Sequence, residues 1–438
     1  MHDNESPGLA TKWGPIRLQE GIRASQMTAF FIAAVVIMML ITFVPQAQPL
    51  VLKELLHVPA AEQGSVTGLL GLVATIVGLL LPSLWGSLSD KAGRRMVFTV
   101  GFLIAAGGIV LYPLASGLLL LYAFRITFAT GTTALNTMQG SLLGDYIDER
   151  DRGKANGIIA SGSGLGAIVT VFLFLSLPRM FQEGGLAPKA SILWTFRIVA
   201  GMGFLAACIV FLGLRKGRVS KDPGRIGFFR LVREGFLQAR RDPLIALAYG
   251  TSFAATGAIT VIGTFLSLWI VDYGTAHGMS GAEALSRGGM MIGVSQVMGL
   301  VTAPFAGILS DKLGKVKAVV VAALFTALSY GATLLVPNPL APGFIVFAVF
   351  LGISQISGIV TSGALAAKQA PEEVRGAVMG LCQVFGALGA MLIAILGGRL
   401  FDLWLPQAPF AIAAVICAGV GLWGITAELR SGKGRARA

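Results

Sequence analysis

The sequence contains 438 residues, of which 55% are hydrophobic and 13% charged, with a mean hydropathy of +0.78 and a formal net charge of +13. An average soluble protein carries about 25% charged residues, so this composition excludes a soluble globular chain and predicts an integral membrane protein. The basic residues stand in short clusters between apolar runs, which argues against nucleic-acid binding. The three cysteines show no metal or disulfide spacing.

The chain begins with a polar segment over residues 1–26 that mixes acidic and basic side chains, unlike the short basic stretch and apolar core of a signal peptide. Twelve apolar runs follow, each long enough to cross a bilayer core of about 30 Å as a helix. They do not alternate in polarity as barrel strands would, so we predict an all-α membrane fold. The runs lie at 27–48, 64–88, 96–116, 120–143, 154–177, 191–213, 244–271, 284–307, 317–336, 343–366, 376–400 and 407–427.

The longest charged connection, over 214–243, divides these runs into two groups of six. We predict a cytoplasmic N-terminal tail over 1–26, an N-terminal six-helix bundle over 27–213, a cytoplasmic linker over 214–243, a C-terminal six-helix bundle over 244–428 and a cytoplasmic tail over 429–438. Within the linker, apolar side chains are interleaved with arginines, which predicts a short amphipathic helix at the headgroup surface. A flexible basic linker is the alternative.

The distribution of positive charge predicts the orientation. With the N-terminus placed inside, 27 of the 34 Lys and Arg residues fall in cytoplasmic segments and five in outer loops, while Arg125 and Arg197 lie within spans. By the positive-inside rule both termini are cytoplasmic. We expect the chain to reside in a bacterial inner (plasma) membrane.

Two short motifs recur in the chain at nearly the same spacing. The stretch GSLSDKAGRR, which begins at Gly86, is echoed by GILSDKLGKVK, which begins at Gly307. DERDRG, which begins at Asp148, is echoed by PEEVRG, which begins at Pro371. Two motifs in the same order predict two homologous halves of six spans each. Because six is even, the halves should be parallel and pseudo-symmetric about an axis along the membrane normal.

On these motifs the chain resembles the major facilitator superfamily over all twelve spans. The resemblance implies two six-helix bundles around a central cavity that opens alternately to each side. It also implies that Asp90 faces the start of span 11 and Asp311 the start of span 5, where each carboxylate would meet the positive end of a helix. The alternative is that these charges only set the topology. The predicted gating residues are Gly86, Asp90, Gly93, Arg94, Arg95, Asp145, Arg152, Gly153, Gly307, Asp311, Gly314, Lys315, Glu372, Arg375 and Gly376.

Arg125 lies within span 4, and an Arg at the bilayer centre costs at least about 2.5–3.5 kcal/mol, so it should face the bundle interior or a wet cavity. Its surroundings resemble the family's motif of R followed by G-x-G, with Gly131 present but Ala129 at the first glycine position. Two roles stay open for Arg125, namely gating or anionic-substrate binding, and structural hydrogen bonding. The candidate substrate-binding residues are Gln46, Arg125, Asn136, Thr256, Gln296 and Gln355.

These features favour a secondary active transporter for a small organic solute, with a lean toward a polar or weakly anionic metabolite, over an enzyme, because no nucleophile–base pair lies at membrane depth. A drug or metabolite efflux antiporter is one alternative, although residues 161–167 lack the Gly-Pro pair that marks that group. A non-transporting membrane sensor is another. We expect the lipid bilayer and a small-molecule substrate as partners, a monomer, and no nucleic acid, cofactor or metal. A proton or sodium ion stays open as the coupling ion.

Overall fold

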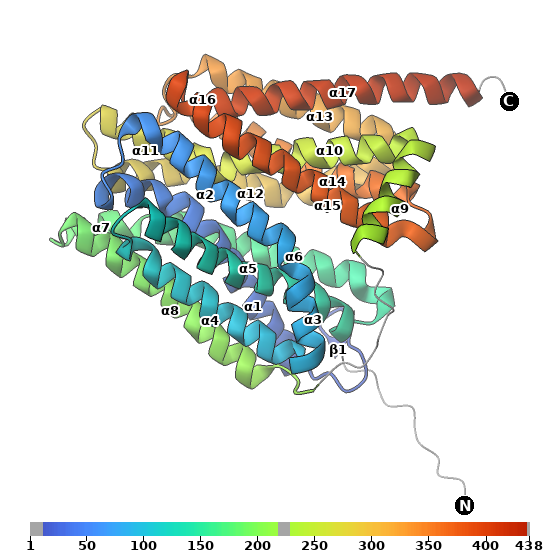
Figure 1. The fold of residues 1–438 in the computed structure, drawn as a ribbon, viewed down its shortest axis with the longest axis horizontal. Helices are drawn as coiled ribbons and strands as arrows, with labels where there is room; N and C mark the ends of the chain where they lie inside the picture. Colours follow the sequence, from blue (N-terminus) through green and yellow to red (C-terminus); the bar gives the residue numbers. More distant parts are fainter. Residues whose placement is uncertain (1–11, 218–227, 436–438) are drawn as a thin grey trace, which may run out of the picture. The chain divides into compact units, whose positions relative to one another are not determined.

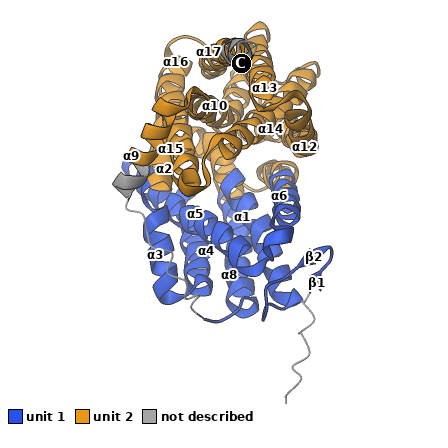
Figure 2. Ribbon diagram, turned by 90° about the vertical axis from the view of Figure 1, so that its right-hand side faces the viewer, with its two compact units in different colours: residues 1–42, 80–170, 193–221 blue, residues 43–79, 171–192, 222–438 orange. Residues whose placement is uncertain are grey.

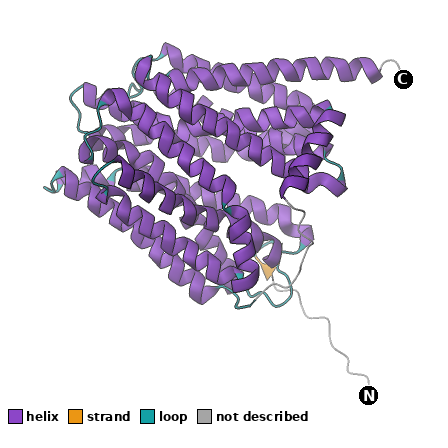
Figure 3. Cartoon of the chain, viewed as in Figure 1, coloured by secondary structure: helices purple, strands orange, loops and turns teal. Residues whose placement is uncertain are grey.

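Long helices make up most of the chain in the computed structural model, which describes residues 12–217 and 228–435 (Figure 3). Within these residues, twelve helical stretches are long and apolar enough to cross a membrane. They coincide with the twelve predicted runs to within a few residues at most ends, so the predicted all-α membrane fold is confirmed.

Figure 1 shows the helices of the first half of the chain, together with the irregular segments that join or extend them. Their bounds are α1 Ala24–Leu50 with η1 Val51–Leu55, α2 Ala60–Leu80, α3 Pro82–Ala92, α4 Arg94–Leu111 with η2 Tyr112–Leu114, α5 Leu118–Tyr146, η3 Glu149–Asp151 with α6 Arg152–Val169, η4 Thr170–Phe174 and α7 Leu177–Glu183, and α8 Pro188–Gly213.

The last six spans follow a linker helix, α9 Phe228–Arg241 (Figure 1). Their bounds are α10 Pro243–Thr260 with η5 Val261–Phe265 and α11 Leu266–Ala276, α12 Gly281–Leu313, α13 Lys315–Ala332 with η6 Thr333–Leu335, α14 Phe344–Gln369, η7 Glu372–Val374 with α15 Arg375–Leu392, η8 Ile393–Gly397 and α16 Gly398–Leu403, and α17 Ala408–Arg435.

Several irregular helical segments repeat between the two halves of the chain. The 3-10 segments η2 and η6 have the same separation along the chain as the two copies of the first motif. The π-helical segments η4 and η8, and the 3-10 segments η3 and η7, have the separation of the two copies of the second motif. Each half therefore adopts the same local backbone at these places, as expected of two pseudo-symmetric six-helix halves.

The second predicted span is interrupted, which the hydropathy pattern does not indicate. A single helix was expected over 64–88, but α2 ends at Leu80 and α3 begins at Pro82. Proline lacks a backbone N–H and its ring opposes a helix continuing through it, so it stands naturally at the start of the next helix.

The helices group by contact into two compact units (Figure 2). Unit 1 comprises residues 1–42, 80–170 and 193–221, and unit 2 comprises 43–79, 171–192 and 222–438. Unit 2 therefore contains all six spans of the second half together with the end of α1, η1, nearly all of α2, and α7 from the first half of the chain. In its core the indole of Trp269 meets the rings of Phe344 and Phe410 edge-on. The predicted division at 214–243 stays a prediction.

The polar segment before the first span contains a small hairpin in unit 1. Strand β1 (Lys12–Trp13) pairs with β2 (Ile16–Arg17), and the chain continues in an antiparallel bridge between Leu18 and Ile147. The amide of Gln19 donates to the carbonyl of Tyr146 at 2.9 Å. The segment is thus attached to the connection between α5 and α6.

The linker helix α9 packs on the second half within unit 2. Its Gly235 carbonyl accepts a hydrogen bond of 3.0 Å from the hydroxyl of Tyr249 in α10, and the ring of Phe236 meets Phe385 of α15 edge-on. A helix is thus found in the linker from Phe228 to Arg241, while its predicted place at the headgroup surface stays a prediction. The linker residues 218–227 lie outside the described residues.

Candidate functional site

The two copies of the first motif adopt the same backbone turn. Gly93 separates α3 from α4 with φ of 90°, and Gly314 separates α12 from α13 with φ of 84°. Residues other than glycine rarely adopt such positive φ angles, which explains glycine at these two positions. At Gly86 and Gly307 a Cβ atom would meet nothing within 4 Å. Neither of these two is therefore needed for close packing within its own unit.

Arg94, the first residue of α4, lies between two carboxylates in unit 1. Its Nε donates to Asp145 at 3.2 Å and its Nη1 donates to Asp90 at 2.9 Å, with a further hydrogen bond to the Ser89 hydroxyl. The Arg94 and Asp145 side chains are about one-fifth exposed, whereas that of Asp90 is 46% exposed. We call Ser89, Asp90, Arg94 and Asp145 the Arg94 cluster. It ties the end of α3 and the start of α4 to the end of α5.

Arg152, one of the predicted gating residues, makes local contacts at the start of α6. It pairs with Glu149 at 3.2 Å and donates to the carbonyl of Gly144 at 3.3 Å, while its Nε has no hydrogen-bond partner. A buried neighbour, Asp151, instead joins Lys154 at 3.0 Å and the amide of Arg17 at 3.1 Å. Asp151 thereby fixes the N-terminal hairpin to the start of α6.

The second-half copies also form local pairs. Lys315 is hydrogen-bonded to Asp311 one turn earlier, and Arg375 lies 3.9 Å from Glu372. Asp90 belongs to unit 1 and Arg375 to unit 2. The predicted pairing of Asp90 with the start of α15, and that of Asp311 with the start of α6, therefore stay predictions.

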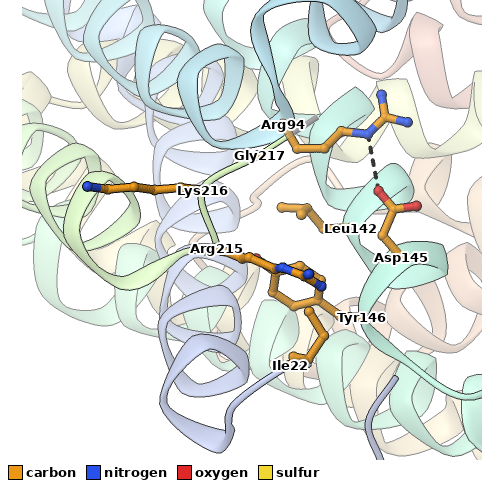
Figure 4. Close-up of a pocket in the computed structure, with 8 residues that line it drawn as sticks. All are labelled: Ile22, Arg94, Leu142, Asp145, Tyr146, Arg215, Lys216 and Gly217. Atoms are coloured by element: carbon orange, nitrogen blue, oxygen red, sulfur yellow. Dashed lines mark hydrogen bonds and ion pairs between the residues drawn. The ribbon is translucent and has the colours of Figure 1, made fainter. Parts of the chain in front are cut away.

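The Arg94 cluster borders a pocket of about 280 Å³ in unit 1 (Figure 4). Figure 4 shows the Arg215 side chain beside the ring of Tyr146, with Lys216 pointing away from it. The Tyr146 hydroxyl accepts a hydrogen bond of 3.1 Å from the amide of Arg215. The lining residues come from four segments: the stretch before α1, the start of α4, the end of α5 and the residues after α8. They are Ile22, Arg94, Leu142, Asp145, Tyr146, Arg215, Lys216 and Gly217.

Arg125 is buried in unit 1, with 6% of its surface exposed. Its guanidinium lies 5.7 Å from the centre of the Phe128 ring, one turn further along α5. A buried arginine in a membrane span needs polar or aromatic neighbours to offset lost hydration. The two roles left open for Arg125 by the sequence both stay predictions.

Gln46 meets an irregular part of span 7 in unit 2. Its Nε2 donates to the carbonyl of Ile262 at 3.3 Å, and Ile262 lies in the π-helical segment η5. Such segments leave carbonyls free of regular helical hydrogen bonds and often occur at functional sites. The Gln46 side-chain oxygen is buried without a hydrogen-bond partner. This oxygen could therefore accept a hydrogen bond from a polar ligand.

The other candidates are distributed over both units. A Cβ at Gly352 would overlap the Ser295 carbonyl, so α12 and α14 cross closely there, with Gln296 and Gln355 near the crossing. Gln355 has a buried side-chain oxygen without a partner. Thr256 of α10 packs where a Cβ on Gly386 of α15 would stand. Asn136 is exposed in unit 1, so its relation to the unit 2 candidates stays a prediction.

Sequence reasoning missed a close contact between α2 and the helical stretch η8–α16 in unit 2. A Cβ at Gly68 would overlap the carbonyl of Ala394, and a Cβ at Gly64 would lie 2.5 Å from that of Gly398. Asp402 accepts hydrogen bonds of 2.7 Å from the amides of both Gly64 and Ser65. We call Gly64, Ser65, Gly68, Ala394, Gly398 and Asp402 the α2–α16 seam. It joins span 2 to span 11, at the ends that the charge distribution predicts to face outward.

Further polar contacts in unit 2 lie at span ends that are also predicted to face outward. Lys53 of η1 lies 4.0 Å from Asp272 and donates to the hydroxyl of Thr275, both in α11. Glu54 accepts a hydrogen bond of 3.3 Å from the amide of Gly281, the first residue of α12. These contacts connect span 1 with spans 7 and 8.

The sequence did contain signals for the α2–α16 seam. They were two glycines one helical turn apart, Gly64 and Gly68, and a lone acidic residue near the end of span 11, Asp402.

Comparison with known proteins supplies the remaining findings. The sequence model of the Major Facilitator Superfamily matches residues 29–340 and 277–436. The chain is 26% identical to the magnetosome protein MamH of Paramagnetospirillum magneticum over 94% of this chain and 95% of MamH. It is 23% identical to the magnetosome protein MamZ of Magnetospirillum gryphiswaldense, where 83% of this chain spans 56% of MamZ.

Two further proteins match the chain over most of its length. The multi-drug resistance efflux pump PmrA of Streptococcus pneumoniae is 24% identical over 83% of this chain and 84% of the pump. A crystal structure of the nucleoside transporter NupG superposes with a TM-score of 0.71 at 13% identity, covering 92% of this chain and 98% of NupG. At that identity the likeness demonstrates a common fold.

Proposed function

Because the chain belongs to the major facilitator superfamily, a family of membrane transporters, we propose that it is a secondary active transporter that moves a small organic solute by rocking-switch alternating access. Its two halves would pivot about a shared binding region so that the solute reaches one side of the membrane at a time. The repeated backbone irregularities support two equivalent halves.

The α2–α16 seam is the observation that carries this proposal. Alternating access needs a contact between the halves that closes one side of the membrane and can separate again. Small residues let helix backbones approach closely in a membrane, and they do so at Gly64 and Gly68 of the first half. Asp402 of the second half adds two charge-assisted hydrogen bonds. In the predicted orientation, the seam would close the outer side.

We further propose that the solute is polar or weakly anionic. The candidate residues are neutral amides and a hydroxyl, together with one buried cation, Arg125. Unsatisfied buried oxygens at Gln46 and Gln355 would accept hydrogen bonds from a polar ligand. That a relative in fold is a nucleoside transporter agrees with a polar organic solute.

Replacing Arg125 tests the substrate class. If Arg125 binds a carboxylate, Arg125→Ala removes a charge-assisted hydrogen bond worth about 1.5–3 kcal/mol. Affinity for an anionic ligand should then fall about 10- to 100-fold, with neutral ligands changed less than twofold, as measured by isothermal titration. Arg197→Ala is the matched control, because Arg197 is an exposed in-span arginine that lies 5.1 Å from the Trp194 ring. Equal losses for anionic and neutral ligands would contradict the role.

Efflux of drugs is a second candidate, favoured by the likeness to PmrA. Residues 161–167 read SGSGLGA and contain no proline, unlike the Gly-Pro pair typical of drug–proton antiporters. We therefore rank metabolite transport first. A drug panel beside a metabolite panel distinguishes the two.

The experiment that tests the function has two stages. Purified protein is first screened by thermal shift against both panels, because a ligand that binds the native state raises the melting temperature. Each stabilising compound is then tested for flux into proteoliposomes, with a proton or a sodium gradient in separate arms. A transporter moves the compound across the membrane. A compound that stabilises the protein but shows no flux under any gradient would favour the sensor alternative.

A further inference from the structure

A groove lies between α12, α13 and α14 in unit 2, and none of the candidate substrate residues lines it. It has a volume of about 220 Å³ and is lined by residues of three membrane spans. Ala306, Ala318 and Ala322 contribute short side chains that leave the space, and Leu309 and Val321 stand at its rim. Leu309 is 46% exposed and Val321 48% exposed. Large exposed apolar side chains on a membrane span indicate a surface that faces lipid.

The walls of this groove suit a hydrocarbon chain. Ser357 and Thr361 are its only polar lining residues, and each hydroxyl donates to a carbonyl one turn earlier, at 2.7 Å and 2.8 Å. The lining side chains thus present no unsatisfied donor. Val321 and Phe325 both line the groove and are one helical turn apart on α13, so the groove extends along this helix for at least one turn.

Two lysines lie just beyond the lining residues along their helices, near the end of α12 and the start of α13. Lys312 follows Leu309 by one turn in α12, and Lys317 precedes Val321 by one turn in α13, so each shares a helix face with a rim residue. Neither lysine forms an ion pair with any of the residues that the structure describes, whereas Lys315 is paired with Asp311. From Lys317 to Phe325 the helix rises about 12 Å. The groove thus runs from a cationic end into the hydrocarbon layer.

We propose that this groove binds an anionic phospholipid, with one acyl chain along α13 and the phosphate between Lys312 and Lys317. Charge and depth together argue for this occupant. Basic residues at the ends of membrane helices attract anionic headgroups, and the apolar walls exclude a soluble anion. The site shares no residue with the α2–α16 seam or the Arg94 cluster, so it does not depend on the transport proposal.

The test measures stabilisation of the full-length protein in an uncharged detergent. Phosphatidylglycerol, phosphatidylcholine with the same acyl chains, and glycerol phosphate are added separately, and bound lipid is counted by native mass spectrometry beside the melting temperature. We expect phosphatidylglycerol to bind at least tenfold more tightly than phosphatidylcholine and glycerol phosphate not to bind. Equal binding of the two lipids, or stabilisation by glycerol phosphate, would overturn the proposal.

Two variants locate the site. Lys312→Gln with Lys317→Gln should weaken phosphatidylglycerol binding about fivefold for each lysine removed, leaving phosphatidylcholine unchanged. Val321→Trp, at the exposed rim, should obstruct the groove and weaken both lipids. Lys91→Gln is the matched control, because Lys91 occupies the position of Lys312 in the first motif copy. An equal loss of phosphatidylglycerol binding in Lys91→Gln would mean that the lipid is attracted to positive charge anywhere on the protein, and the proposal would fail. Melting temperatures without lipid show whether each variant is folded.

Discussion

Arg94 donates to two carboxylates that come from different helices, and this geometry requires a planar guanidinium. Nε and Nη1 are fixed relative to each other, so the group can hold Asp90 and Asp145 at the same time. An ammonium group is a point charge without that fixed fork. The pair with Asp145 is also the less exposed of the two, so it is screened less by water.

Arg94→Lys should slow transport without weakening the solute's binding. Partly exposed ion pairs contribute about 0.2–1 kcal/mol each, so losing one of the two pairs from a gate predicts a rate up to about fivefold lower. The measurement compares initial flux in proteoliposomes with affinity from thermal shift. Arg150→Gln removes an exposed cation of the α5–α6 connection as a control. A fall in affinity with unchanged flux would contradict a gating role.

Asp402 is expected to hold the α2–α16 seam through its charge. Asp402→Asn keeps the size of the side chain, but the neutral amide oxygen accepts the amides of Gly64 and Ser65 more weakly, because hydrogen bonds to charged groups contribute about 1.5–3 kcal/mol and neutral ones about half. A cysteine placed at Ser65 in a cysteine-free background should react with maleimide about tenfold faster in the variant. Glu62→Gln, an exposed acidic residue of α2, should leave the reaction rate unchanged. Equal labelling rates in Asp402→Asn and in the protein that keeps Asp402 would mean that this carboxylate does not hold the seam together.

At the level of elements, close packing depends on where a glycine stands along α2. Gly64 and Gly68 lie against the backbone of η8 and α16, whereas a Cβ at Gly71 would meet the Ala394 methyl at an ordinary 3.7 Å. Hydropathy treats these glycines alike, since all belong to the same apolar run. Only the packing partner distinguishes them.

Gly68→Ala and Gly71→Ala form a matched pair at this contact. A methyl group at Gly68 would overlap a backbone carbonyl, and overpacking of this kind costs about 1–3 kcal/mol. Gly68→Ala should therefore lower the melting temperature and speed labelling of the cysteine at Ser65. Gly71→Ala should change neither measurement. Similar behaviour of the two variants would mean that the helices are not in contact in the membrane.

Several elements were accessible to sequence reasoning and others were not. The helix of the linker followed from its interleaved apolar and basic residues, and α9 is present. The hairpin at Lys12–Arg17 was not foreseen, because two-residue strands carry no periodicity, and it is held by the distant residues Ile147 and Asp151. The break at Pro82 carried a signal, a proline within an apolar run, that the hydropathy pattern alone does not register.

For the whole molecule, the asymmetry of positive charge predicts which ends of the spans face the cytoplasm. Along the sequence, α2 begins at Ala60, close to the glycines of the α2–α16 seam, and the motif turn at Gly93 comes after span 2. In the predicted topology the seam therefore belongs to one end of that span and the motif turn to the other. The predicted orientation therefore decides which of the two is the outer contact.

Cysteine labelling in intact cells tests this orientation. With the three native cysteines replaced, Ala61→Cys, before the apolar part of α2, should react with a membrane-impermeant maleimide from outside. Arg150→Cys, in the α5–α6 connection, should react only after the membrane is permeabilised. Both positions are exposed, so burial does not limit either reaction. The reverse pattern would invert the topology and make the seam a cytoplasmic contact.

Twelve spans, their approximate ends and the duplicated halves were determined by the sequence alone, because hydrophobicity, charge and motif spacing are properties of the chain read in order. The tertiary structure decided which residues meet. Arg94 takes Asp145 as a partner while Arg152 takes Glu149, and Asp402 joins a helix that lies far away in the chain. Such contacts depend on how helices pack, and the local pattern of a membrane helix, apolar on nearly every side, does not specify which face meets which neighbour.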